Sequence, residues 1–231
     1  MRMLWLIFMT AWTLAGSIDF CSMAPRQHTR WTATQIARIK PLVFLACLGP
    51  LARWIWLGFN AGLSANPAQF LILSSGIWAL VMLMITLCIT PVRRLIKQPA
   101  LIGLRRMLGQ FSFFYTVLHV AGWALWEHGV SLSSMWQDTL DRTFIMIGVL
   151  ATLPLVALSL TSTRGWMRRL GPHWQRLHRS IYPVAILSIW HFWLVRSGKN
   201  DFSEPAIYAV LLGLLLAVRI VLELRQRAVK A

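Results

Sequence analysis

Four long intervals of this chain contain no charged side chain, and they limit the possible folds more than any other feature. They cover residues 54–92, 107–126, 143–163 and 180–195. A helix needs about 20 mainly apolar residues to cross a bilayer, so the first interval holds part of one span and all of a second. Only 13% of the residues are charged, against about a quarter in an average soluble domain. The sequence therefore predicts an integral membrane protein.

The expected fold is all-α and polytopic, a bundle of six transmembrane helices. We place these helices at residues 42–59, 70–89, 111–126, 143–160, 180–195 and 206–222. Residues that favour turns or break helices separate them. The signals are Ala65-Asn66-Pro67, Thr90-Pro91, Gly171-Pro172 and Glu204-Pro205.

Alternate loops between these helices differ sharply in charge, and one side carries 18 of the 23 basic residues. These are Arg26, Arg30, Arg38, Lys40, Arg93, Arg94, Lys97, Arg105, Arg106, Arg164, Arg168, Arg169, Arg176, Arg179, Arg219, Arg225, Arg227 and Lys230. Cytoplasmic loops are enriched in Lys and Arg, so both ends of the six-helix unit are expected in the cytoplasm. Basic cytoplasmic loops that face anionic lipid explain the net charge of +16 more simply than nucleic-acid binding does.

Residues 1–30 are expected to be an extension that precedes a domain covering residues 31–231. Residues 3–18 form an apolar run behind Arg2 and resemble a signal peptide. A seventh span, a segment lying on the membrane surface, and a translation start set too far upstream are the alternatives, with Met23 as a possible true start.

Three histidines lie in or beside the uncharged stretches: His119, His178 and His191. Ionisable residues at membrane depth are functional candidates by default, and histidines on facing helices are how helical bundles hold haem or metal. His178 and His191 are 13 residues apart, or about 20 Å along a helix, so they cannot bind one metal. Depth pairs His191 with His119, which predicts a bis-histidine haem between the third and fifth helices.

Arg105 lies 14 residues before His119, close to the same helix face and at the expected depth of His178. Guanidinium is a poor iron ligand, so Arg105 either binds a haem propionate or is a solvated residue of the cytoplasmic side. An ideal helix would turn His178 about 140° away from His191. Either a kink at Pro183 or a position of His178 ahead of the regular turns would remove this conflict.

The other histidines carry less signal. His28 and His128 are expected to be solvated at the two membrane edges, and His173 lies in a basic loop near water or headgroups.

Two segments carry a family resemblance: RRMLGQFSFFYTVLHV and LTSTRGWMRRLGPHWQRLHRSIYPVAILSIWHFW. They resemble the ferric-reductase-like transmembrane domain and, within it, the MsrQ (YedZ) type of haem-binding membrane subunit. The string from Thr161 to Tyr182 is the most specific part. The resemblance covers about Thr32 to the C-terminus and has no counterpart for residues 1–30.

The resemblance implies a subunit of the bacterial inner membrane that binds haem b and passes electrons, without a substrate-reducing site of its own. Membrane quinones would donate the electrons, and a periplasmic molybdenum-cofactor methionine-sulfoxide reductase that repairs oxidised proteins would accept them. His119, His178 and His191 match the haem-region histidines of the family. Arg105 stands where larger relatives have a fourth histidine, so the resemblance leaves one or two haems open.

The resemblance also implies FMN, although no motif that would bind its phosphate is visible. The periplasmic partner is expected to dock on acidic outer loops that contain Asp138, Asp141, Asp201 and Glu204.

A membrane transporter or channel is the main alternative, because intramembrane histidines also relay protons or bind transition metals. Transporters often show paired repeats, and no convincing internal repeat is visible in the sequence. A scaffold with purely structural histidines is a third possibility.

Overall fold

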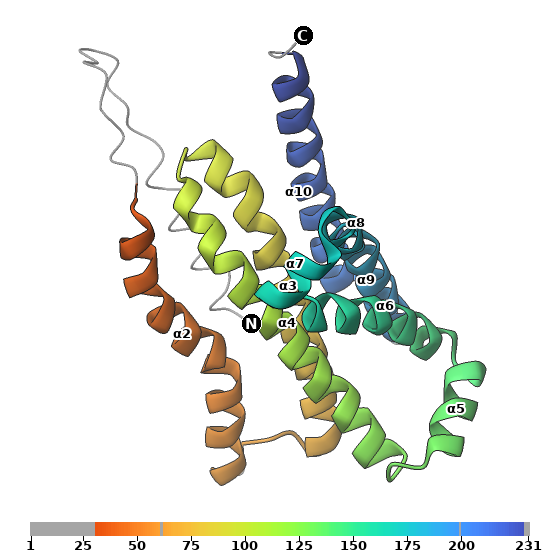
Figure 1. Cartoon of the computed structure of the whole chain (residues 1–231). Coiled ribbons are helices and arrows are strands. Elements are labelled where there is room, and N and C mark those ends of the chain that lie inside the picture. The colour runs from red at the N-terminus through yellow and green to blue at the C-terminus, as the bar shows by residue number, and fades with distance from the viewer. Residues whose placement is uncertain (1–30, 61, 199, 229–231) are drawn as a thin grey trace. The chain divides into compact units, whose positions relative to one another are not determined.

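The computed structural model describes residues 31–60, 62–198 and 200–228, and every regular element in these ranges is a helix (Figure 1). In chain order they are α2 (Ala33–Phe59), α3 (Pro67–Leu95), η1 (Pro99–Leu101), α4 (Ile102–Gly122), η2 (Trp123–Glu127), α5 (Leu132–Asp141), α6 (Thr143–Leu160), α7 (Arg164–Leu170), α8 (Pro172–His178), α9 (Ile181–Ser197) and α10 (Ser203–Ala228). The expected all-α fold is confirmed for these residues. The expectations for residues 1–30, including His28, lie outside the described part.

Local sequence explains where the first two helices begin. The Thr32 side chain accepts a hydrogen bond from the backbone N–H of Gln35, and the Gln35 side chain accepts one from the backbone of Thr32. Asn66 caps α3 through the backbone N–H of Gln69, and Pro67 follows as the first helical residue. Both arrangements supply acceptors for N–H groups that have no partner within the helix, and proline at this position removes one such donor.

The expected break at Thr90-Pro91 is wrong, because both residues lie inside α3. Proline removes one backbone donor, and neighbouring helices allow membrane helices to tolerate this loss. Gly171-Pro172 does separate two helices, α7 and α8. The predicted span at residues 143–160 coincides with α6, whereas α4 begins nine residues before the predicted 111 and gives way to the π-helical η2 after Gly122.

Four of the described helices are long and apolar enough to cross a membrane: α2, α3, α6 and α10. The two helices that carry His119 and His191 are α4 and α9. α4 has Arg105 and Arg106 near its start, and α9 has 17 residues. The six-span arrangement therefore stays a prediction.

The helices pack mainly as two pairs, α3 with α4 and α6 with α9. α10 packs against α3 and α9, and α2 packs against α4. Val184 and Ala185 of α9 are fully buried in one apolar core, and Tyr115 of α4 is fully buried in the other. The Tyr115 hydroxyl donates to the Cys47 carbonyl across 2.6 Å, which joins α4 to α2.

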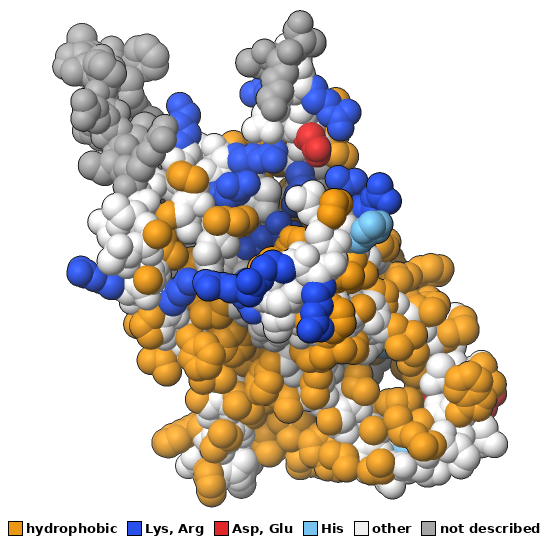
Figure 2. All heavy atoms as spheres, in the orientation of Figure 1, with side chains coloured by type: hydrophobic (Ala, Val, Ile, Leu, Met, Phe, Trp, Pro, Cys, Tyr) orange, Lys and Arg blue, Asp and Glu red, His pale blue; other side chains and the backbone are white. Residues whose placement is uncertain are grey.

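The molecular surface separates basic from apolar side chains. Figure 2 shows Lys and Arg gathered over one half of the visible face and hydrophobic side chains over the other half. Large apolar side chains are exposed along α2 and α10, for example Leu42, Phe59, Val210 and Ile220. Such surfaces are rare on soluble monomers and suit contact with lipid.

Candidate functional site

His119 of α4 and His191 of α9 lie together at the junction of the two helix pairs. Their ring centres are 6.1 Å apart, and the ring planes meet at 80°. Both side chains are half-buried. The structure thus brings together the two histidines that the sequence paired by depth.

Each of these rings is fixed by a backbone carbonyl of the neighbouring helix. His119 Nδ1 lies 2.8 Å from the carbonyl oxygen of Ile72 in α3. His191 Nδ1 lies 2.6 Å from the carbonyl oxygen of Phe144 in α6. A carbonyl only accepts hydrogen bonds, so Nδ1 carries the proton and Nε2 of the neutral ring keeps its lone pair. Histidines that bind metals generally have their other ring nitrogen anchored in this way.

The pair also fits a single iron by distance. If each Nε2 lay about 2.0 Å from one shared metal ion, the ring centres could be about 6 Å apart. The observed 6.1 Å agrees with this value. His119 and His191 together would therefore suit a metal that binds two imidazole nitrogens.

His178 lies apart from this pair, at the end of α8, and Arg179 and Ser180 separate it from α9. Of the two alternatives, the structure shows His178 ahead of the regular turns of α9, and Pro183 falls in the first turn of that helix. His178 stacks on Trp174 with ring centres 3.9 Å apart and donates from Nδ1 to the Trp174 carbonyl. Burial lowers the pKa of His178, the carbonyl opposes this shift, and the charge of Arg105 lowers the pKa further.

Arg105 belongs to a basic cluster near His178. It lies within electrostatic reach of Arg93 in α3 and Arg219 in α10, and the Arg219 guanidinium lies 4.9 Å from the centre of the Tyr182 ring. Arg93 Nε is buried without a hydrogen-bond partner. Within the described ranges no carboxylate forms an ion pair with Arg93, Arg105 or Arg219. The half-buried position of Arg105 favours the binding of an anion over full solvation.

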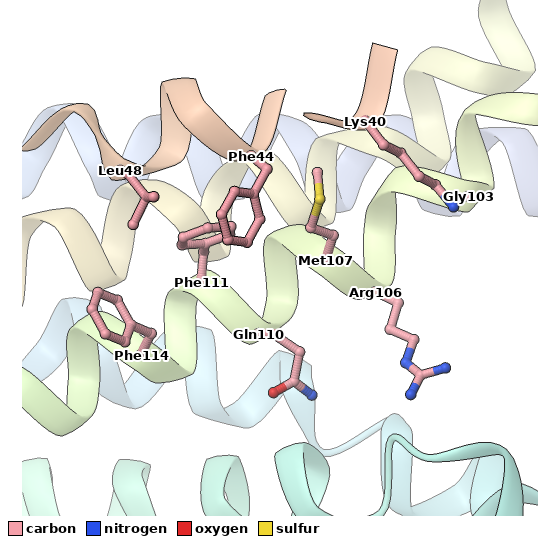
Figure 3. Close-up of a pocket in the computed structure, with 9 residues that line it drawn as sticks. All are labelled: Lys40, Phe44, Leu48, Gly103, Arg106, Met107, Gln110, Phe111 and Phe114. Atoms are coloured by element: carbon pink, nitrogen blue, oxygen red, sulfur yellow. The ribbon is translucent and has the colours of Figure 1, made fainter. Parts of the chain in front are cut away.

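An apolar groove of about 480 Å³ lies between α2 and α4 (Figure 3). Phe44, Phe111 and Phe114 form much of its wall. Lys40 and Arg106 lie toward one end, and Gln110 borders the groove with its amide hydrogen-bonded to Ser159 of α6. The groove suits a flat apolar ligand with a polar ring or head.

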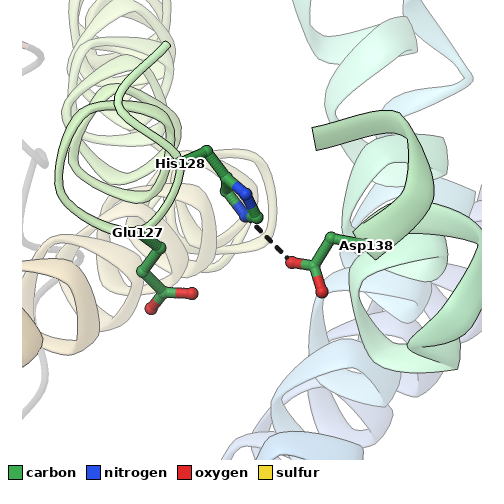
Figure 4. A group of neighbouring side chains, drawn as sticks. All are labelled: Glu127, His128 and Asp138. Carbon is green, nitrogen blue, oxygen red and sulfur yellow. Dashed lines mark hydrogen bonds and ion pairs between the residues drawn. The ribbon is translucent and has the colours of Figure 1, made fainter. Parts of the chain in front are cut away.

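His128 lies in a network of polar side chains on η2 and α5 (Figure 4), so its expected solvation is wrong. Its side chain is only 6% exposed, and its Nε2 lies 3.0 Å from an Asp138 oxygen. Glu127, His128 and Asp138 have possible metal-binding atoms within 4.8 Å of one another. Arg142 also pairs with Asp138 and lies 3.9 Å from Glu127, so the carboxylates already have a cationic partner.

The four acids of the expected docking surface differ in their ion pairs and exposure. Asp138 pairs with Arg142, and Glu204 pairs with Arg196. Asp201 is half-exposed and lies 4.0 Å from Arg196. Asp141 is exposed at the end of α5, so Asp141 and Asp201 are the more accessible of the four acids.

Comparison with known proteins identifies the family to which the chain belongs. Residues 75–189 match the family described as ferric reductase like transmembrane component. This segment contains His119 and His178 and ends just before His191. The "Protein-methionine-sulfoxide reductase heme-binding subunit MsrQ" of Bordetella pertussis is 52% identical over 196 residues, which cover 85% of this chain and 95% of the relative. The chain belongs to the MsrQ family.

Other MsrQ proteins align over similar lengths. The relative from Herminiimonas arsenicoxydans is 41% identical, with 80% of this chain and 86% of the relative covered. The relative from Xanthomonas euvesicatoria is 40% identical, with 87% of this chain and 94% of the relative covered. No solved structure matches the chain.

Sequence reasoning missed the contribution of α3 and α6 to this MsrQ site. The groups that hold the two rings are main-chain carbonyls of Ile72 and Phe144, and every residue has a carbonyl. Only the packing of α4 on α3 and of α9 on α6 reveals which carbonyls are used.

Proposed function

We propose that this chain is the haem b-binding, electron-transferring subunit of a protein-methionine-sulfoxide reductase system in the bacterial inner membrane. Quinones would supply electrons, and a periplasmic molybdenum-cofactor reductase would receive them. The observation that carries the proposal is the His119–His191 pair, with each Nδ1 on a backbone carbonyl and the ring centres 6.1 Å apart. The names of the MsrQ relatives, which are heme-binding subunits, support it.

His119 and His191 would hold the haem iron, and the bound haem would supply one-electron redox chemistry. With both histidines as ligands, the bound group would have no place for oxygen or substrate. The carbonyls of Ile72 and Phe144 keep both rings in the tautomer that presents Nε2. The site therefore suits electron passage rather than substrate turnover.

His178 and the cluster of Arg93, Arg105 and Arg219 support a second haem at the opposite depth. His178 also has Nδ1 on a carbonyl, and the unpaired guanidinium groups would attract propionates. One or two haems therefore remain in the proposal, and FMN stays a prediction from the resemblance.

The groove between α2 and α4 supports the quinone part of the proposal. Its phenylalanines would pack against an isoprenoid tail, and Lys40 and Arg106 at one end would meet the polar ring. The groove borders α4, the helix that also carries His119. In the proposed topology six spans place both ends of the domain, with the basic loops, in the cytoplasm.

The deciding experiment is a dithionite-reduced minus oxidised absorbance spectrum of the detergent-purified protein. We expect a b-type signal that His119→Ala or His191→Ala removes in large part. A remainder that depends on His178 would establish the second haem. His173→Ala is the matched control, because His173 is exposed in α8, and we expect it to keep the full signal.

The opposite outcome is equally clear. Folded wild-type protein from haem-supplied cells that shows no haem signal would exclude the electron-transfer function. It would favour a transporter or channel that uses the same histidines for protons or metal ions.

A further inference from the structure

His119 and His191 have equivalent surroundings, and the residues around one ring lie at a constant offset along the chain from those around the other. Adding 72 to the numbers of Ile72, Gly76 and His119 gives Phe144, Gly148 and His191. In each set the histidine follows its carbonyl acceptor by 47 residues. The pairs α3–α4 and α6–α9 thus build the same local structure, although the sequence shows no convincing repeat.

The glycine of each set lies directly against the imidazole ring. A Cβ atom on Gly76 would lie 3.0 Å from His119 Nδ1, and one on Gly148 would lie 2.9 Å from His191 Nδ1. Each glycine is four residues after the carbonyl acceptor, so in a regular helix its own N–H bonds to that same carbonyl. A side chain there would stand between the carbonyl and the imidazole.

We infer that Gly76 and Gly148 are positioning residues for the two proposed haem ligands. Each lets an imidazole reach a helix carbonyl, which sets the plane and the tautomer of the ring. This inference rests on the proposed function, because only the proposed haem would give the two rings an iron to bind. It assigns α3 and α6 a direct part in tuning the site, beside the helices that carry the ligands.

The carbonyl bonds have an electronic consequence. A hydrogen bond from Nδ1 makes the imidazole a more basic ligand, which favours ferric over ferrous iron and lowers the reduction potential. If both rings held one haem iron, the angle between their planes would affect the anisotropy of the electron paramagnetic resonance signal of the oxidised protein.

The test compares Gly76→Ala and Gly148→Ala with Gly109→Ala in purified, haem-loaded protein. Gly109 is a matched control because it lies in α4 and an added Cβ would meet only Thr86 Cγ2, at 3.7 Å. We expect both site variants to raise the midpoint potential and to change the paramagnetic resonance g values. The control should match the wild type. Unchanged potential and g values in haem-bearing Gly76→Ala and Gly148→Ala would overturn the inference.

A second measurement applies if the alanine variants bind no haem. Gly76→Ala is placed in the wild type and in His119→Ala, and thermal unfolding is measured in haem-free protein. We expect a loss of stability only where the imidazole is present, because the added methyl group then meets the ring. Equal losses in both backgrounds would overturn the inference.

The two proposals fail in different ways. A wild-type protein without a haem signal would overturn the proposed function. Glycine variants that bind haem and match the wild type would overturn only the positioning role.

Discussion

Asp138 gathers three hydrogen-bond donors at the junction of η2, α5 and α6. Its carboxylate accepts from Arg142, from His128 and from the indole of Trp123. Burial raises the pKa of the Asp138 carboxyl, but the bonds from Arg142 and Trp123, the charge of Arg142 and the bond from His128 lower it by more. The pKa of Asp138 therefore lies below its ordinary value, and the ionised form stabilises the folded protein.

Acid should weaken this network. A carboxyl whose pKa is lower in the folded state stabilises the protein above its unfolded pKa of about 3.9. That stability is lost as the pH falls through the folded value. We expect Asp138→Asn to lower the thermal unfolding temperature at about pH 7 and to lose much of the difference from wild type in acid. Asp141→Asn, on the exposed end of the same helix, is the control. A destabilisation by Asp138→Asn that is independent of pH would contradict the ion-pair account.

At the scale of elements, the contact between α2 and α4 combines a tight part with an open one. Tyr115 packs edge-on against Trp54, with ring centres 5.7 Å apart, and donates to the Cys47 carbonyl. Toward Lys40 and Arg106 the same two helices leave the groove of about 480 Å³. The fully buried hydroxyl holds the helices together while the groove remains accessible to a ligand.

Filling this groove should impair quinol oxidation. We expect Leu48→Trp, on the groove wall, to slow haem reduction by a quinol by roughly tenfold, or about 1.4 kcal/mol in the barrier. Reduction by dithionite should stay at the wild-type level. Leu45→Trp is the control, since Leu45 lies on α2 and is 64% exposed. Equal quinol rates in both variants would remove the groove from the proposed route.

At the scale of the whole molecule, charge and apolarity separate along the helices. The basic half in Figure 2 includes the ends of α3 and α10 that carry Arg93, Arg94, Arg225 and Arg227. The His119–His191 pair lies toward Glu127 and the Asp138 network, since His119 is eight residues before Glu127. In the proposed orientation this pair is on the periplasmic side, where electrons would leave.

Single cysteines would test that orientation. In a background without native cysteines, Ser133→Cys at the start of α5 and Gly165→Cys in α7 introduce exposed thiols. We expect a membrane-impermeant maleimide that passes the outer membrane to label Ser133→Cys in intact cells and Gly165→Cys only after the inner membrane is permeabilised. The reverse pattern would place the basic loops outside and would invert the proposed direction of electron transfer.

Hydropathy and charge were enough to predict an all-helical membrane protein, and the predicted span at 143–160 coincides with α6. Such signals are local, because a side chain's transfer energy into lipid depends little on its neighbours. Helix depth is local too, since each residue advances a helix by about 1.5 Å. This is why the sequence paired His119 with His191 and kept His178 apart.

Packing between helices determined the features that hydropathy and charge could not predict. Hydropathy and charge did not reveal the break after His178, the burial of His128 against Asp138 or the continuation of α3 through Pro91. The carbonyls of Ile72 and Phe144 became part of the site only because Gly76 and Gly148 let two imidazoles approach. Close contact between helices, with glycine at the point of contact, determines which backbone groups a side chain can reach.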